Sequence, residues 1–204
     1  MIRHAVLVLV GVMALVESRA DNTNLTGVGD ARVAVWTVTP STNAPGDLHL
    51  TVECSGLSAM LVQGGVSLRI PGQASSAKPG TPDLPRLAKL LPARKGAKAV
   101  LVFLGSNPTN LSDVVVAPAV GFKLEALEGA QRVLCPYRQP DPAVYGIDQY
   151  WPAELGRLDA ASIGTQIVVR VECCPVQYNP ITKSIRFFRR LEGELRFEPA
   201  PWAR

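Results

Sequence analysis

The sequence predicts an all-β fold: a single antiparallel β-sandwich or open barrel of about ten short strands, preceded by a signal peptide. The chain has 204 residues, of which 47% are hydrophobic and 19% charged, a balance that excludes a disordered tail. Its 17 glycines and 17 prolines favour many short strands and turns over long helices. Helical periodicity is weak and confined to residues 122–131.

The first 20 residues predict a secretory signal peptide. Arg3 precedes an unbroken apolar run over residues 5–16. As a helix this run would be about 18 Å long, too short for a bilayer core of about 30 Å. Ser18 and Ala20 are small residues at the two positions that signal peptidase reads, so we expect cleavage after Ala20. The expected location is secreted, periplasmic or at the cell surface, with no membrane contact after cleavage.

The mature chain predicts one domain, because no repeat or linker divides it. Residues 21–32 predict a flexible arm, residues 33–198 the domain, and residues 199–204 a C-terminal tail. Gly64 and Gly65 predict a hairpin turn, whereas residues 117–164 are less regular. Strand-like runs cover residues 33–38, 48–54, 59–70, 84–91, 99–104, 111–116, 166–172, 184–189 and 194–197.

Charge gives little reason to expect a nucleic-acid partner. The formal net charge is +4 and no basic block is present. Arg186, Arg189 and Arg190 cluster near a predicted strand end. We interpret this cluster as a solvated face, because nucleic-acid surfaces combine more charge with interleaved aromatic rings.

Four cysteines are present: Cys54, Cys135, Cys173 and Cys174. An exported chain can form disulfides, and four cysteines allow three connectivities. Buried free thiols are an equal alternative. No CxxC pair occurs and His49 is the sole histidine after cleavage, so the sequence predicts no metal and no cofactor.

The sequence predicts no catalytic residues. His49 and Cys54 are five residues apart on one predicted strand and therefore face opposite sides, although a distant pairing of His49 stays open. The motifs GxSxG, HExxH, GxxxxGK and GxGxxG are absent. Asp141, Asp148 and Glu154 are interpreted as solvated turn residues rather than a carboxylate pair. We therefore expect a binding protein rather than an enzyme.

Four short motifs occur in series, with predicted strands between them. Each also has a structural meaning: glycine opens backbone conformations closed to other residues, proline stiffens the start of a strand, and Asn-Pro fixes a turn. The motifs are Gly80-Thr81-Pro82-Asp83-Leu84-Pro85; Ala117-Pro118; Tyr145-Gly146 with Tyr150-Trp151-Pro152; and Gln177-Tyr178-Asn179-Pro180 followed by Thr182-Lys183.

In this order and spacing the motifs resemble the propeptide domain of the gingipain family of cysteine peptidases, over residues 61–197. The resemblance implies an all-β domain that folds beside a catalytic domain, assists its folding and blocks its active site. The implied partner is the catalytic domain of a gingipain-like cysteine peptidase, bound in cis or in trans. That catalytic domain is absent from this chain. We therefore expect a fragment of a longer precursor, a split or decayed gene, or a free-standing inhibitor.

The resemblance also implies an inhibitory loop after the Ala-Pro strand end, here residues 119–131. In the family this loop carries a basic side chain into the specificity pocket of the peptidase. The best-matched position here holds Glu125, so the candidates are Lys123 and then Arg132. A register shift of two residues, an enzyme of different preference, or another mode of inhibition would each explain this departure.

A second function class stays open. A secreted β-sandwich that binds carbohydrate or mediates adhesion would need an exposed aromatic platform. Only Tyr137, Tyr145, Tyr150 and Trp151 could form one. A hydrolase with an unrecognised site is the third alternative.

Overall fold

The computed structural model describes residues 22–24, 34–73, 77–126, 132–163 and 166–199. The predicted signal peptide lies outside the described residues, as do residues 25–32 of the predicted arm and residues 200–204 of the tail. Within the described part of the chain, no helix is long and apolar enough to cross a bilayer.

The predicted all-β class is confirmed, with more strands than expected. The described residues form fifteen strands and one four-residue helix. In chain order these are β1 (Asn22–Asn24), β2 (Val35–Pro40), β3 (Leu48–Glu53), β4 (Ser58–Val62), β5 (Gly65–Arg69), β6 (Leu87–Pro92), β7 (Ala97–Gly105), β8 (Thr109–Leu111), β9 (Gly121–Ala126), β10 (Arg132–Tyr137), α1 (Pro142–Tyr145), β11 (Gly156–Ile163), β12 (Gln166–Cys173), β13 (Val176–Asn179), β14 (Ser184–Phe187) and β15 (Arg190–Pro199).

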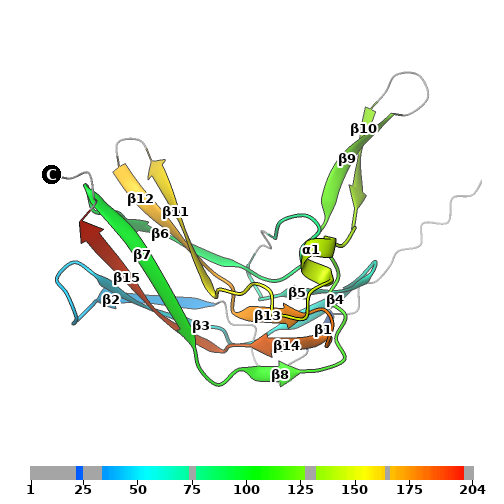
Figure 1. Ribbon diagram of the computed structural model, residues 1–204, viewed down its shortest axis with the longest axis horizontal. Helices are drawn as coiled ribbons and strands as arrows, with labels where there is room; N and C mark the ends of the chain where they lie inside the picture. Colours follow the sequence, from blue (N-terminus) through cyan, green and yellow to red (C-terminus); the bar gives the residue numbers. More distant parts are fainter. Residues whose placement is uncertain (1–21, 25–33, 74–76, 127–131, 164–165, 200–204) are drawn as a thin grey trace, which may run out of the picture.

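The strands form small antiparallel sheets around one body. The sheet β2-β3-β15-β7 lies opposite the sheet β11-β12-β6, and β7 contacts β11 where the two sheets approach (Figure 1). The sheets β13-β14-β8 and β1-β4-β5 complete the body. The remaining pair, β9 and β10, projects away from the body as a two-stranded hairpin (Figure 1).

Alternation along the central strands builds the core. In β15, Leu191 and Leu195 are fully buried while Glu192 is exposed, as the two-residue period of a strand requires. β3 pairs with β15 and adds Leu50 and Val52, both fully buried. Burying one such side chain is worth roughly 1.5–3 kcal/mol, so these central strands carry much of the stability.

The turn between β4 and β5 is as predicted. Gly64 and Gly65 have φ values of 86° and 139°, in the region that favours glycine. The irregular region over residues 117–164 holds three strands in addition to the predicted ones: β9, β10 and β11. The weak helical pattern over residues 122–131 was misleading, because residues 121–126 pair with β10 as strand β9. The predicted strand over residues 111–116 is also wrong: β8 ends at Leu111.

Candidate functional site

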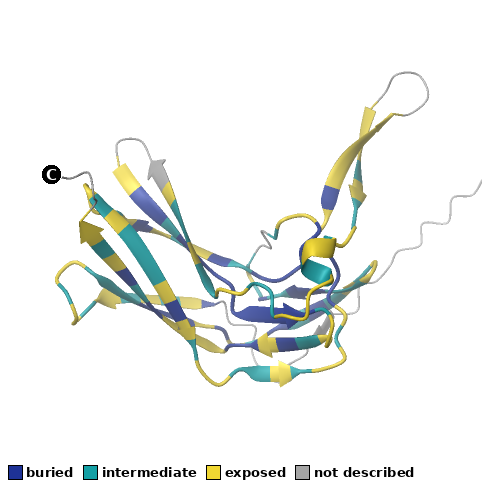
Figure 2. Cartoon of the chain, viewed as in Figure 1, coloured by how far each residue is buried: buried dark blue, intermediate teal, exposed yellow. Residues whose placement is uncertain are grey.

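The β9–β10 hairpin stands out because, among the described strands, its two strands pair only with each other. Its two strands contact each other along six paired residues, from Gly121 opposite Tyr137 to Ala126 opposite Arg132. Every residue of β9 after Gly121 is exposed, and no residue of β10 is buried (Figure 2). A protein rarely extends such a ribbon into solvent without a partner for it.

The two faces of the hairpin differ in chemistry. Directly paired residues of antiparallel strands lie on one face, so Phe122, Leu124, Leu134 and Pro136 share a face. We call it the apolar face. The side chains of Phe122, Leu124 and Leu134 are 59%, 63% and 57% exposed. Exposed apolar side chains gathered in this way mark interaction surfaces.

The opposite face, which we call the polar face, satisfies its own charges. Lys123 and Glu125 form an ion pair with the Nζ and Oε1 atoms 2.7 Å apart. The hydrogen bond between them raises the pKa of Lys123 and lowers the pKa of Glu125. Cys135 lies opposite Lys123 and shares a hydrogen bond with Glu125.

The two predicted inhibitory residues lie on opposite faces of the hairpin. Lys123 is on the polar face of β9, paired in charge with Glu125. Arg132 is the first residue of β10, and its register opposite Ala126 places it on the apolar face. Of the predicted inhibitory loop, residues 121–126 are strand and residues 127–131 lie outside the described chain. One approach to a partner therefore presents only one of the two candidates.

The first sequence motif forms the base on which the hairpin stands. The backbone N–H of Asp83 donates to the carbonyl of Ala117 at 2.9 Å, and that of Ala119 donates to Thr81 at 2.7 Å. On the other leg, the N–H of Asp141 donates to the carbonyl of Gly80 at 2.9 Å. Residues 80–83 thus hold the chain as it enters the hairpin and as it returns.

A buried carboxylate lies at this base. Asp83 is 3% exposed and accepts hydrogen bonds from Ser67 Oγ at 2.8 Å and from Arg69 at 3.0 and 3.1 Å. Arg138, the residue after β10, donates to Asp83 Oδ2 at 3.2 Å and also to the carbonyl of Pro118. A buried charge is tolerated only when it is paired and hydrogen-bonded in this way.

The other residues of the first motif also have structural partners. Pro82 forms an isolated bridge with Pro118, and Leu84 is 1% exposed in the core. The carbonyl of Pro85 accepts a hydrogen bond from the Cys174 thiol at 3.4 Å. The motif therefore ties the hairpin base to the body.

The last motif fastens the chain around Trp151. Gln177 Nε2 donates to the carbonyl of Pro152 at 2.8 Å, and Tyr178 exchanges two backbone hydrogen bonds with Trp151, each 2.8 Å long. Asn179 Nδ2 donates to Asp148 at 2.8 Å, while its Oδ1 accepts from the backbone beyond Pro180. This amide closes the turn between β13 and β14.

A comparison with family models supplies the family of this fold. Residues 62–201 match the family described as Propeptide_C25, which is more than half of the chain. The chain belongs to the Propeptide_C25 family. The resemblance drawn from the four motifs is thereby confirmed.

Curated proteins with similar sequences are also found for this Propeptide_C25 chain. It is 27% identical over 113 residues to Gingipain R2 of Porphyromonas gingivalis, in two strains. The match covers 55% of this chain and 15% of the relative, so the chain spans a small part of the curated protein that it matches.

Solved structures show the same fold. The complex of Porphyromonas gingivalis RgpB pro- and mature domains matches with a TM-score of 0.64 and 20% identity, over 81% of this chain and 85% of that one. A structure on the zymogenic latency of gingipain K matches with the same TM-score and 17% identity, over 89% of this chain and 100% of that one.

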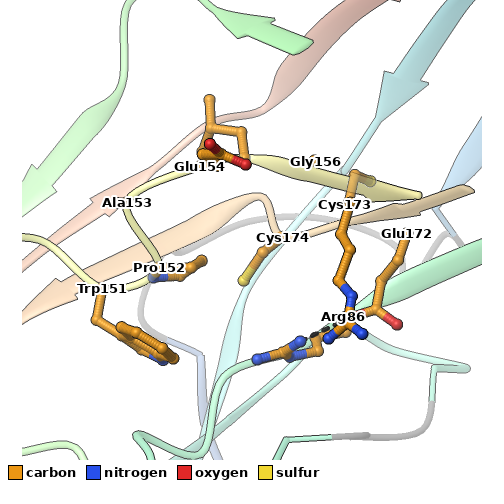
Figure 3. Close-up of a pocket in the computed structure, with 11 residues that line it drawn as sticks. Arg86, Trp151, Pro152, Ala153, Glu154, Gly156, Glu172, Cys173 and Cys174 are labelled. Carbon is orange, nitrogen blue, oxygen red and sulfur yellow. Dashed lines mark hydrogen bonds and ion pairs between the residues drawn. The ribbon is translucent and has the colours of Figure 1, made fainter. Parts of the chain in front are cut away.

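One cavity of the Propeptide_C25 chain lies beside Trp151 and Pro152. It measures about 260 Å³, and Figure 3 shows Cys174 and Arg86 lining it. Arg86 is held by Glu172 at 2.7 Å, and Glu172 also binds Arg170 at 2.6 Å. The Arg86 cation that lines the cavity is thus already paired with the Glu172 carboxylate.

Three thiols of the Propeptide_C25 chain are buried: Cys54, Cys173 and Cys174. Burial raises the pKa of Cys54 to about 12 and that of Cys174 to about 11, and it raises the pKa of Cys173 as well. These thiols are therefore protonated at neutral pH. His49 lines a separate groove with Val102 and Glu194 on the outer side of β3, β7 and β15.

The four rings considered for an aromatic platform have separate partners in the Propeptide_C25 fold. Tyr145 donates to the carbonyl of Val116 at 3.0 Å, and its ring meets that of Tyr178 edge to face. The Tyr150 hydroxyl lies 2.9 Å from Ser184 Oγ. Trp151 packs against the core, and the ring of Tyr137 lies over Gly121 at the hairpin base. The four rings therefore do not form a shared flat surface on which a sugar could stack.

Replacing Gly80 by alanine is expected to destabilise the domain by about 2 kcal/mol or more. Gly80 has φ +84°, which costs other residues about 1–2 kcal/mol, and an added Cβ would lie 3.1 Å from the carbonyl oxygen of Gln139. Gly96→Ala is the matched control, since Gly96 has φ +73° but no atom within 4 Å of the added Cβ. Urea unfolding measures both variants; equal losses would contradict a packing role for Gly80.

A maleimide is expected to label one thiol per native chain, at Cys135, and all four after denaturation. At pH 8 roughly one buried Cys174 thiol in a thousand is ionised, given a pKa of about 11, and burial also blocks access. The hydrogen bond to Glu125 raises the pKa of Cys135, so Glu125→Gln should speed its labelling. Intact mass counts the adducts, and Cys135→Ser is the control. Rapid labelling of a second native thiol would contradict the expectation.

Proposed function

We propose that this chain is a non-catalytic propeptide of a gingipain-like cysteine endopeptidase. It binds the catalytic domain, assists its folding and keeps it inactive until maturation. Export, with cleavage after Ala20, brings the chain to the periplasm, the cell surface or the medium. Membership of the Propeptide_C25 family and the fold shared with gingipain pro-domains support this proposal.

The observation that carries the inhibitory part is the β9–β10 hairpin. It projects from the body, exposes an apolar face and contributes almost nothing to the core. Both outer edges of this two-stranded ribbon are unpaired among the described strands. Such a ribbon can enter a cleft or add to the edge of a partner's sheet, with main-chain hydrogen bonds giving affinity.

The test is an inhibition assay with purified residues 21–204 and the catalytic domain of a gingipain-type peptidase. We expect the chain to slow hydrolysis of a peptide substrate and to raise the yield of active enzyme when both are refolded together. The chain alone should hydrolyse nothing. If it neither inhibits nor assists any such enzyme at micromolar concentration, the proposed function is wrong.

The assay also separates the two inhibitory candidates. Because Arg132 shares the apolar face and Lys123 is paired with Glu125 on the other, we expect Arg132→Ala to weaken inhibition about 30-fold. Lys123→Ala should change it by about threefold or less. Arg157→Ala on the body, an exposed residue bound to Asp159, is the control. A larger effect at Lys123 would mean that the polar face meets the enzyme.

A further inference from the structure

The hairpin joins the body through two short legs, and one side chain links them. Residues 117–119 lead into β9, and residues 138–141 lead away from β10. Arg138 donates from one nitrogen, Nη1, to the carbonyl of Pro118 on the opposite leg and to Asp83 in the body. Its side chain is only 15% exposed. One guanidinium thus contacts both legs and the base beneath them.

Charge balance does not require this second cation at Asp83. The carboxylate already accepts two hydrogen bonds from Arg69 and one from Ser67. Removing another charged side chain from water costs free energy that pairing only partly returns. The best-attested benefit of such a buried ionic group is that it selects one arrangement over its alternatives.

We propose that Arg138 is a positioning residue, which fixes the direction of the β9–β10 hairpin relative to the body by fastening both legs to Asp83. This inference rests on the proposed function for its effect on inhibition, because the hairpin is the part proposed to meet the peptidase. The direction itself is a property of the chain alone.

The length of the ribbon makes this direction matter. Six residues per strand span about 20 Å at about 3.3 Å per residue. A swing of about 15° at the base then moves the far end by about 5 Å. Productive contacts at an active site are lost with misplacements of about 1 Å. A loose base would therefore lower affinity without changing any residue on the hairpin.

The experiment measures hairpin direction without the peptidase. Spin labels are attached to Cys135 on the hairpin and to a Thr37→Cys variant on the exposed face of β2, and the distribution of distances between them is recorded. We expect Arg138→Ala to broaden this distribution about twofold or more. Arg69→Ala is the matched control: it removes another arginine from Asp83 but touches neither leg, so it should leave the width unchanged.

Arg138→Lys is measured alongside, because it keeps the charge but loses the planar guanidinium with its fixed donor directions; we expect an intermediate width. Circular dichroism confirms that each variant is folded. An unchanged width in both Arg138 variants overturns the proposal, and so does equal broadening by Arg69→Ala.

A second measurement ties direction to inhibition. In the peptidase assay we expect Arg138→Ala to raise the inhibition constant at least tenfold, and Arg69→Ala to leave it within threefold of wild type. If wild type fails to inhibit while Arg138→Ala still broadens the distances, the positioning role stands and the proposed function falls. If wild type inhibits and the broadened Arg138→Ala inhibits equally well, the direction of the hairpin has no role in inhibition, and that part of the proposal is overturned.

Discussion

Replacing residues 122–136 with a two-glycine turn is expected to weaken inhibition of a gingipain-type peptidase by about 100-fold or more, while the body stays folded. The hairpin holds the exposed side chains of Phe122, Leu124 and Leu134. Because each is about 60% exposed, burying the rest against a partner contributes roughly 1–2 kcal/mol, and each 1.4 kcal/mol is tenfold in affinity. Loss of all three contacts therefore accounts for the stated change.

The body should tolerate the deletion because the hairpin supplies no buried side chain to it. In β9 only Gly121 is buried, and the deletion retains it. We therefore expect the free energy of unfolding, measured in urea, to stay within about 0.5 kcal/mol of the wild-type value. The matched control shortens the exposed β2–β3 connection over residues 41–46 instead. Full inhibition by the hairpin deletion would mean that the body, not the hairpin, blocks the enzyme.

Asp83→Ala is expected to lower the free energy of unfolding by about 3–5 kcal/mol. The carboxylate is 3% exposed and lies between Arg69 and Arg138, so its removal leaves two largely buried guanidinium groups near each other without their anion. Ser67 loses its acceptor as well. The measurement is urea unfolding followed by circular dichroism.

The control for this variant is Asp159→Ala. Asp159 also pairs with two arginines, Arg157 and Arg170, but it lies on the surface of β11 and its side chain is 36% exposed. Exposed pairs are worth about 0–1 kcal/mol, so this loss should be small. Comparable losses in the two variants would show that the Asp83 network is no more important than a surface pair.

The sequence reveals the body better than the hairpin, for a physical reason. β3 and β15 bury one face, so their apolar residues alternate with polar ones and the pattern is visible. The turn at Gly64 and Gly65 is visible because only glycine adopts those φ values readily. β9 also alternates, Phe122 and Leu124 with Lys123 and Glu125, but both of its faces are exposed, so the alternation marks no core. β10 places Val133, Leu134 and Cys135 in succession and does not alternate.

The faces of the hairpin and the base beneath it also escape sequence reasoning. Lys123 and Leu124 are neighbours in β9 and face opposite sides in any register. Whether Arg132 shares the face of Leu124 depends on the register of β9 against β10, and a shift of one residue would move it to the other face. The Asp83 cluster joins Ser67 and Arg69, both in β5, with Arg138, which lies 55 residues beyond Asp83 along the chain. Gly80 and Pro82 are noticed as a motif, but their role as the hairpin base requires the fold.

The separation of hairpin and body has an evolutionary consequence. Because β9 and β10 add almost nothing to the core, substitutions on the ribbon cost little in folding free energy. Residues 80–83 and Arg138 hold the base of the hairpin, and their hydrogen bonds do not involve the side chains of β9 and β10. Under the proposed function, a lineage can therefore change what the hairpin recognises by substituting a few exposed residues, without changing the residues of the body.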